Sequence, residues 1–147
     1  MLNTPALDKL VAQGQYTLEI VGFEGRTSMR GEQSHPITQT DLILSIASNA
    51  PFPGASTRKL DVRIAGPATT FDRTKDGELV IGACRVNGGE YELVVMATEA
   101  FLSHCLLALS TIPRSRCFLA VTTQSKVELS TEGHVFVLEA AIHTKPL

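Results

Sequence analysis

The sequence is poor in residues and segments on which several classes of protein depend. It has no tryptophan, and aromatic residues make up only 5% of the chain, which disfavours surfaces that stack bases or sugars. No run approaches the ~18 apolar residues that a transmembrane helix needs. The first residues, MLNTPALDKLVAQGQ, lack the basic and apolar regions of a secretory signal. We therefore expect no membrane segment and a cytoplasmic location.

Cysteine is scarce, and its pattern disfavours a disulfide framework. The chain has 3 cysteines, an odd number, and Cys84 and Cys105 lie in apolar runs. Such residues are typical of free thiols in a reducing compartment. Because these two fall on predicted core faces and Cys117 opens an apolar strand, we expect no activated nucleophile among them, and we expect Cys105 to be buried.

Motifs that carry chemistry are missing as well. The chain has no Cys-x-x-Cys, His-x-x-His or His-Glu-x-x-His spacing and no Gly-x-Ser-x-Gly. The segment from Asp72 to Gly77 resembles the start of an EF-hand loop, but Ala83 stands where that loop requires a bidentate acid, so we interpret it as a plain turn. The sequence thus predicts no catalytic residue, no metal ligand and no cofactor, and an enzyme is the less favoured interpretation.

What is present is typical of one globular domain spanning residues 1–147. The apolar fraction is 44% and the charged fraction 19%, which suits an ordered chain with a core of its own. The formal net charge is −2, so no overall positive field steers nucleic acid or anionic membranes toward the protein.

The rest of the chain is organised around residues 78–113. Two apolar runs flank Asn87-Gly88, the strongest short-range signal for a hairpin, since both residues tolerate positive φ. A two-residue turn there places Cys84 opposite Tyr91, and a three-residue turn places it opposite Glu92. Because both faces are apolar away from the tip, we expect the hairpin to be central and covered on both sides.

A helix over about 98–112 follows this hairpin. Thr98 is the predicted N-cap, and Pro113 ends the helix. The predicted buried stripe consists of Phe101, Leu102, Cys105, Leu106, Leu109 and Ile112. Leu107 lies on the opposite side, either as an isolated surface leucine or as a packing surface for another subunit. We take the second interpretation as a hypothesis and name Leu107 as a candidate oligomer interface.

The remaining segments alternate between short apolar runs and turn residues. Thr4-Pro5 begins a short N-terminal helix, and strands are expected over residues 15–24, 39–48, 60–64, 117–123, 126–130 and 134–143. The pattern predicts a mainly β (α+β) fold, an antiparallel β-sandwich or partly open barrel of about eight strands with one packed helix.

Two polar segments rich in glycine or proline, residues 25–36 and 49–57, are predicted to be loops or, for the first, a strained edge. Loops on a rigid scaffold commonly carry recognition, and arginine, methionine and aromatic side chains are enriched in interfaces. The candidate anchors for a protein partner are Arg26, Met29, Arg30, Phe52 and Arg58.

These observations favour a non-enzymatic protein-binding or assembly domain, comparable to an inhibitor, an immunity protein or a structural subunit. Two alternatives stay open. One is a barrel that binds single-stranded nucleic acid through the basic clusters Arg58-Lys59, Arg114-Ser115-Arg116 and Arg26 with Arg30. The other is a small-ligand binder or enzyme whose pocket is built from scattered residues.

One stretch resembles a known group of proteins, although no resemblance spans the chain. Gly22-Phe23-Glu24-Gly25, followed by the strand over residues 42–48, is similar to the opening strands of phage-tail and secretion-spike hub proteins. The resemblance rests on strand pattern and implies a structural role.

A homodimer is also expected from the last strand. Both of its faces are apolar, with Val135, Val137 and Ala141 on one and Phe136, Leu138, Ala140 and Ile142 on the other. An open strand edge at that place would invite pairing with another chain. If the long helix covers one face of this strand instead, no dimer is needed.

Overall fold

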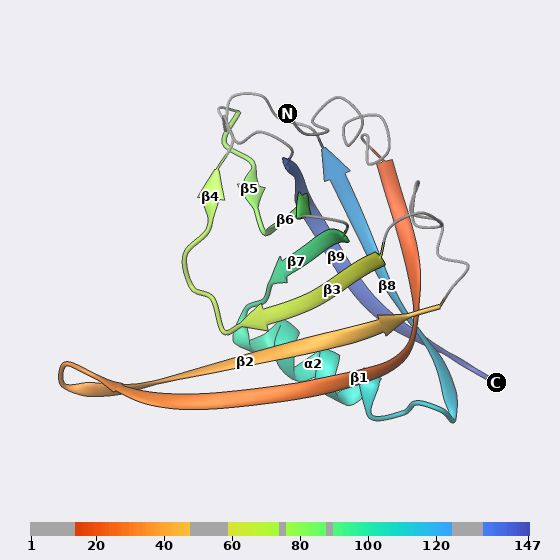
Figure 1. The fold of residues 1–147 in the computed structure, drawn as a ribbon, viewed down its shortest axis with the longest axis horizontal. Helices are drawn as coiled ribbons and strands as arrows, with labels where there is room; N and C mark the ends of the chain where they lie inside the picture. The colour runs from red at the N-terminus through yellow and green to blue at the C-terminus, as the bar shows by residue number, and fades with distance from the viewer. Residues whose placement is uncertain (1–13, 48–58, 74–75, 88–89, 125–133) are drawn as a thin grey trace.

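The fold is mainly β, with a single helix among the residues that the structure describes (Figure 1). The computed structural model describes residues 14–47, 59–73, 76–87, 90–124 and 134–147. The elements are β1 (Gly14–Glu32), β2 (His35–Ile46), β3 (Lys59–Gly66), β4 (Asp72–Arg73), β5 (Leu79–Val80), β6 (Gly82–Asn87), β7 (Glu90–Met96), α2 (Glu99–Leu109), β8 (Ser115–Gln124) and β9 (His134–Pro146). No helix in these ranges is long and apolar enough to cross a membrane.

Seven strands close into a barrel in the order β1-β2-β3-β7-β6-β9-β8, and β4 and β5 form a separate two-stranded sheet. The mainly β fold with one packed helix is confirmed. One pair departs from the expected antiparallel arrangement, because β3 and β7 run parallel, with Val62 opposite Leu93. Parallel neighbours require a long connection, and the chain between them carries β4, β5 and β6. The short N-terminal helix and the strand expected over residues 126–130 lie outside the described residues.

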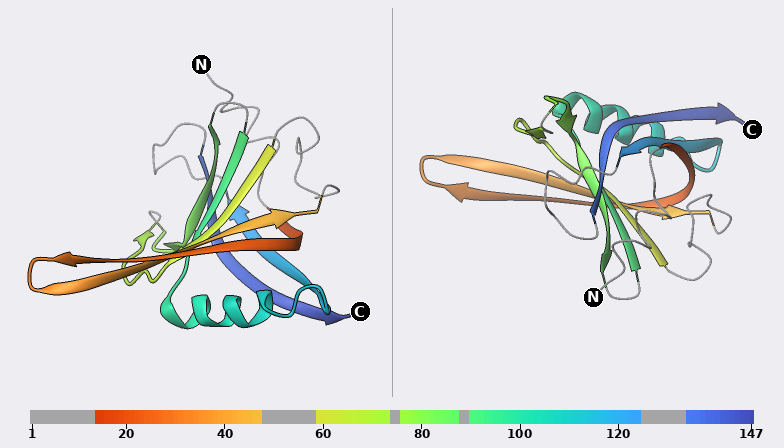
Figure 2. Two further views of the ribbon diagram at one scale, coloured as in Figure 1. Left: turned by 60° about the horizontal axis from the view of Figure 1, so that its bottom comes forward. Right: turned by 90° about the horizontal axis from the view of Figure 1, so that it is seen from above.

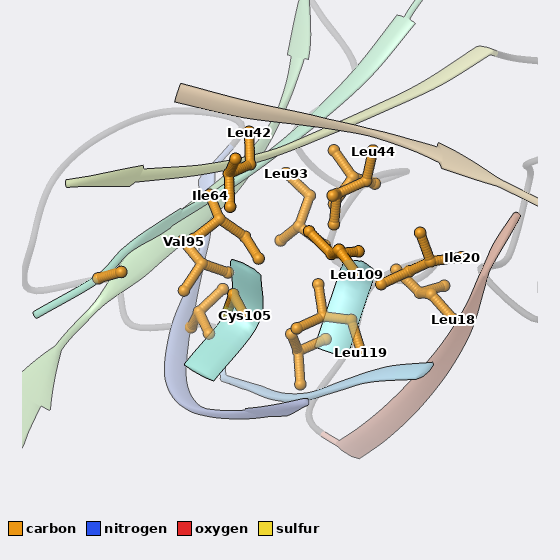
Figure 3. Packing of buried hydrophobic residues seen from close by; sticks show 14 of the residues in the cluster. Leu18, Ile20, Leu42, Leu44, Ile64, Leu93, Val95, Cys105, Leu109 and Leu119 are labelled. Carbon is orange, nitrogen blue, oxygen red and sulfur yellow. The ribbon is translucent and has the colours of Figure 1, made fainter. Parts of the chain in front are cut away.

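The core lies inside the barrel and beneath α2, where alternate residues of every barrel strand point inward (Figure 3). Leu18, Leu42, Ile64, Leu93 and Leu119 are fully buried there. Leu102, Cys105 and Leu109 are the buried residues of α2, and Leu109 points into the leucine cluster in Figure 3. The burial predicted for Cys105 is confirmed.

The predicted N-cap is confirmed, since the Thr98 hydroxyl accepts a hydrogen bond from the backbone N–H of Phe101 at 3.2 Å. The helix ends earlier than expected, at Leu109. The Ile112 backbone N–H donates to the Leu109 carbonyl and the Thr111 hydroxyl to the Ala108 carbonyl, so tight turns satisfy the last carbonyl groups. Placing Leu106 in the buried stripe is wrong, because 42% of this residue is exposed.

The central hairpin is present, but neither predicted register holds. Cys84 lies opposite Leu93 and Asn87 opposite Glu90, so Asn87 belongs to the ladder. Relative to the register predicted for a two-residue turn, the pairing is shifted by two residues, which leaves Cys84, Leu93 and Val95 on the one face predicted for them. Gly82 lies where a Cβ atom would collide with the Val94 carbonyl oxygen, which lets the two strands approach closely.

The last strand, β9, is paired on both sides over only part of its length. Residues 136–137 pair with both β6 and β8, whereas residues 139–146 pair with β8 and, among the described residues, with no strand on their other side. Helix α2 contacts the same strand, as the alternative interpretation required. Contact with α2 therefore removes one reason for expecting a dimer through β9, and the dimer stays a prediction.

Candidate functional site

The most distinctive feature of the molecule is a two-stranded ribbon that extends away from the barrel (Figures 1 and 2). Residues 25–36 were expected to form a loop or a strained edge, and the loop is wrong, because β1 and β2 continue as a regular ladder to Glu32 opposite His35. Only Gln33 and Ser34 form the turn, and Gln33 has the positive φ of 52° that such a tight hairpin favours. We call residues 25–39 the arm.

The arm receives little support from the barrel. Among the described residues, β8 pairs with β1 only as far as Ile20, and β3 pairs with β2 only from Thr40 onward. Beyond these points the two strands of the arm pair only with each other, so each has one free edge. A two-stranded hairpin by itself is only marginally stable in water, so a surface of this kind gains from contact with another molecule.

The two faces of the arm differ in charge. Residues directly opposite each other in an antiparallel ladder share a face. The face continuous with the barrel interior carries no charge and consists of Gly25, Thr27, Met29, Gly31, Pro36 and Thr38. The other face carries Arg26, Ser28, Arg30, Glu32, His35, Ile37 and Gln39, with Asp41 opposite Arg26. We call these the neutral face and the charged face.

One polar contact crosses the ladder on the side of the neutral face, and one large side chain of this face is exposed. The hydroxyls of Thr27 and Thr40 lie 3.0 Å apart across the ladder. Met29 is 72% exposed and is the most exposed large apolar residue of the arm. On the charged face, Arg30 forms an ion pair with Glu32 at 3.1 Å.

The structure brings together three of the five predicted anchor residues. Arg26, Met29 and Arg30 all lie on β1 within the arm, the arginines on the charged face and the methionine on the neutral face. Phe52 and Arg58 lie outside the described residues. Leu107 lies on the solvent side of α2, at 67% exposure, on an element separate from the arm (Figure 2).

Two arginines from the basic clusters considered for phosphate contacts, Arg116 and Arg30, form ion pairs with carboxylates. Arg116 donates to both carboxylate oxygens of Glu19, at 3.0 and 3.1 Å, and lies over the ring of Phe118. The hydrogen bond from Arg116 lowers the pKa of Glu19 below its ordinary value. Arg30 donates a single hydrogen bond to Glu32, at 3.1 Å. These pairs reduce the positive charge that the two arginines offer to a nucleic-acid backbone.

A second candidate site is a pocket of about 530 Å³ on the outside of the barrel. Its floor is the outward face of β6 and β7, together with Phe136 of β9, and Thr70, Phe71 and Asp72 form a wall at the start of the β4–β5 sheet. The hairpin was expected to be covered on both sides, and this outer side is instead only partly covered, with Met96 at 38% exposure.

The lining of this pocket combines apolar surface with carboxylates. Ala83, Val94, Met96 and Phe136 supply the apolar area, and Asp72 and Glu92 are the two charged lining residues. No sequence pattern indicated this pocket, because its residues come from five strands, β4, β5, β6, β7 and β9, whose order was not predictable. Within the described ranges, no group of three or more His, Cys, Asp or Glu residues is placed to hold a metal ion.

Comparison with models of protein families, with curated proteins and with solved structures yielded no match to this chain.

Proposed function

We propose that this protein is a non-enzymatic binding or assembly subunit that contacts another protein through its arm. The observation that carries the proposal is the arm itself, with its two free strand edges and its uncharged face. Free edges are templates for pairing with another chain, and strand addition gives affinity through main-chain hydrogen bonds. Met29, Arg26 and Arg30 belong to residue types that are enriched in interfaces.

The experiment compares two triple variants of the tagged protein in pull-downs from its native host, read by quantitative mass spectrometry. Alanine at Arg26, Met29 and Arg30 is expected to reduce the recovery of a specific partner about tenfold or more, since a few anchor residues carry most of the binding energy. The matched control has alanine at Ser103, Glu139 and Lys145, which are exposed on other elements, and keeps the partner. Equal recovery by the two triple variants would exclude the arm as the contact surface.

A second candidate function, binding of a small ligand, is favoured by the pocket beside β4. An apolar floor flanked by Asp72 and Glu92 suits an organic cation with a hydrophobic body. Opposite charges in a partly desolvated site attract more strongly than in water, so a cation is expected to bind better than an anion of the same shape.

Phenethylamine and phenylacetate are matched probes for this site, because they differ chiefly in the sign of their charge. In two-dimensional NMR titrations we expect the amine to shift the amide signals of Val94 and Met96 at lower concentrations than the acid. Glu92→Gln should reduce the difference between the two probes. Identical titrations with both probes, or shifts confined to other strands, would rule out a cation site here.

A further inference from the structure

We propose that the arm binds a second copy of this chain, and that the two arms pair antiparallel along the free edge of β1 to form a four-stranded sheet. This inference rests on the proposed function, because it names the partner of the same surface. The two-fold axis of such a dimer passes between the two β1 strands at Thr27.

The free edge of β1 is long and lacks the lysine and proline residues that often protect such edges. Residues 21–32 have β2 on one side and, among the described residues, no strand on the other. Natural edge strands are commonly blunted by lysine, proline or shortness. Residues 21–32 contain neither lysine nor proline, whereas β2 carries Pro36 and has a shorter free stretch. The edge of β1 is therefore the better template.

The charges along this edge are arranged symmetrically. The segment EGRTSMRGE has Glu24 and Glu32 at its ends, with Arg26 and Arg30 placed symmetrically between them. If two copies paired with Ser28 on the axis, Glu24 would oppose Glu32 and Arg26 would oppose Arg30, which is unfavourable. A shift that places Thr27 on the axis brings Glu24 opposite Arg30 of the second copy, and this attraction occurs twice because of the symmetry.

The neutral face selects the same register. With Thr27 on the axis, Phe23 lies opposite Gly31 of the second copy, and Met29 lies opposite Gly25. A large side chain can cover a glycine across a strand pair, and around the position of a Cβ at Gly31 there is open space within 4 Å. This pairing covers both Phe23, which is 40% exposed, and Met29, which is 72% exposed.

A third symmetric register, centred on Met29, gives less favourable contacts. With Met29 on the axis, Arg26 would face Glu32 favourably, but Met29 would meet its own counterpart. Phe23 would then lie opposite residue 35, beyond the turn of the second copy, and would stay exposed. Of these three registers, only the one centred on Thr27 brings opposite charges together on the charged face and places a large side chain opposite a glycine on the neutral face.

The first test measures the mass of the purified full chain by sedimentation equilibrium from low to high micromolar concentration. We expect a reversible dimer of the 15.8 kDa chain. Glu24→Arg alone and Arg30→Glu alone each convert two attractions into repulsions and should weaken the dimer on the order of tenfold. The double variant Glu24→Arg/Arg30→Glu restores opposite charges across the interface and should recover most of the affinity.

The second test uses cross-linking, which reads the register directly. Thr27→Cys places a thiol beside its own counterpart at the two-fold axis, so mild oxidation should give a covalent dimer. Ser34→Cys is the matched control on the same arm, because the two tips point to opposite ends of the dimer, roughly 45 Å apart along the strands. The native cysteines are buried and contribute little background.

The outcomes separate this inference from the proposed function. Wild-type protein that stays monomeric at high micromolar concentration overturns the dimer, while a partner lost with the arm triple variant would still support protein binding. A dimer that dissociates with Leu107→Asp and is unaffected by Glu24→Arg overturns the arm pairing in favour of the α2 face. Cross-linking of Ser34→Cys in preference to Thr27→Cys overturns the register.

Discussion

Replacing Leu109 by alanine is expected to lower the free energy of unfolding by about 2–5 kcal/mol. Leu109 is fully buried at the last turn of α2, and it points into the cluster formed by Leu44, Ile20 and Leu119 (Figure 3). The barrel cannot collapse around a missing isobutyl group without moving the helix that covers it. The cost should therefore include both the lost transfer free energy and a cavity.

Leu107→Ala is the matched control, since it is the same substitution two residues earlier in the same helix. Leu107 is 67% exposed, so its change should alter the free energy of unfolding by less than about 0.5 kcal/mol. Urea denaturation followed by circular dichroism measures both, at one protein concentration because self-association would add to the stability. Similar losses for the two variants would mean that α2 does not pack as described.

Alkaline pH is expected to destabilise the protein through its buried thiols. Burial raises the pKa of Cys84 and of Cys105 to about 12, with smaller contributions from the Glu92 carboxylate and from Cys117 respectively. In the unfolded chain both thiols ionise near their ordinary value of about 8.5. The unfolded state therefore binds fewer protons than the folded state between these two values, and stability falls as the pH rises through that window.

From pH 8 to pH 10 the two thiols together should cost about 4 kcal/mol of unfolding free energy. Urea titrations at the two pH values measure this difference, and Cys84→Ala and Cys105→Ala should each remove about half of it, whatever they cost at neutral pH.

In the folded protein at pH 8, a bulky thiol reagent should label Cys105 only after unfolding. Labelling within seconds in the intact fold would contradict its burial.

Local patterns predicted the elements of this protein well. The alternation in β6 and β7 assigned Cys84, Leu93 and Val95 to one buried face, and an error of two residues in the register did not change that face. The N-cap at Thr98 was also readable, because a cap depends on hydrogen bonds within three residues. Face assignment and capping are properties of short segments, which is why they survive without knowledge of the neighbours.

The arm shows where a local reading fails. Glycines and polar residues over 25–36 suggested a loop, because strands are usually recognised by apolar residues on a buried face. The arm has no buried face, and its ladder is set by cross-strand pairing from Phe23 opposite Leu44 out to the turn. The alternating charges at Glu24, Arg26, Arg30 and Glu32 were the available signal for a strand.

The sequence by itself determined a mainly β chain with a capped helix after the central hairpin, free buried thiols and no recognisable catalytic motif, since each follows from composition or short-range spacing. Only the tertiary structure decided the parallel pairing of β3 with β7, the projection of the arm and the pocket of Asp72, Glu92 and Phe136. These features depend on which distant strands become neighbours. Which strands become neighbours is decided when the whole barrel closes, and no local sequence pattern specifies this.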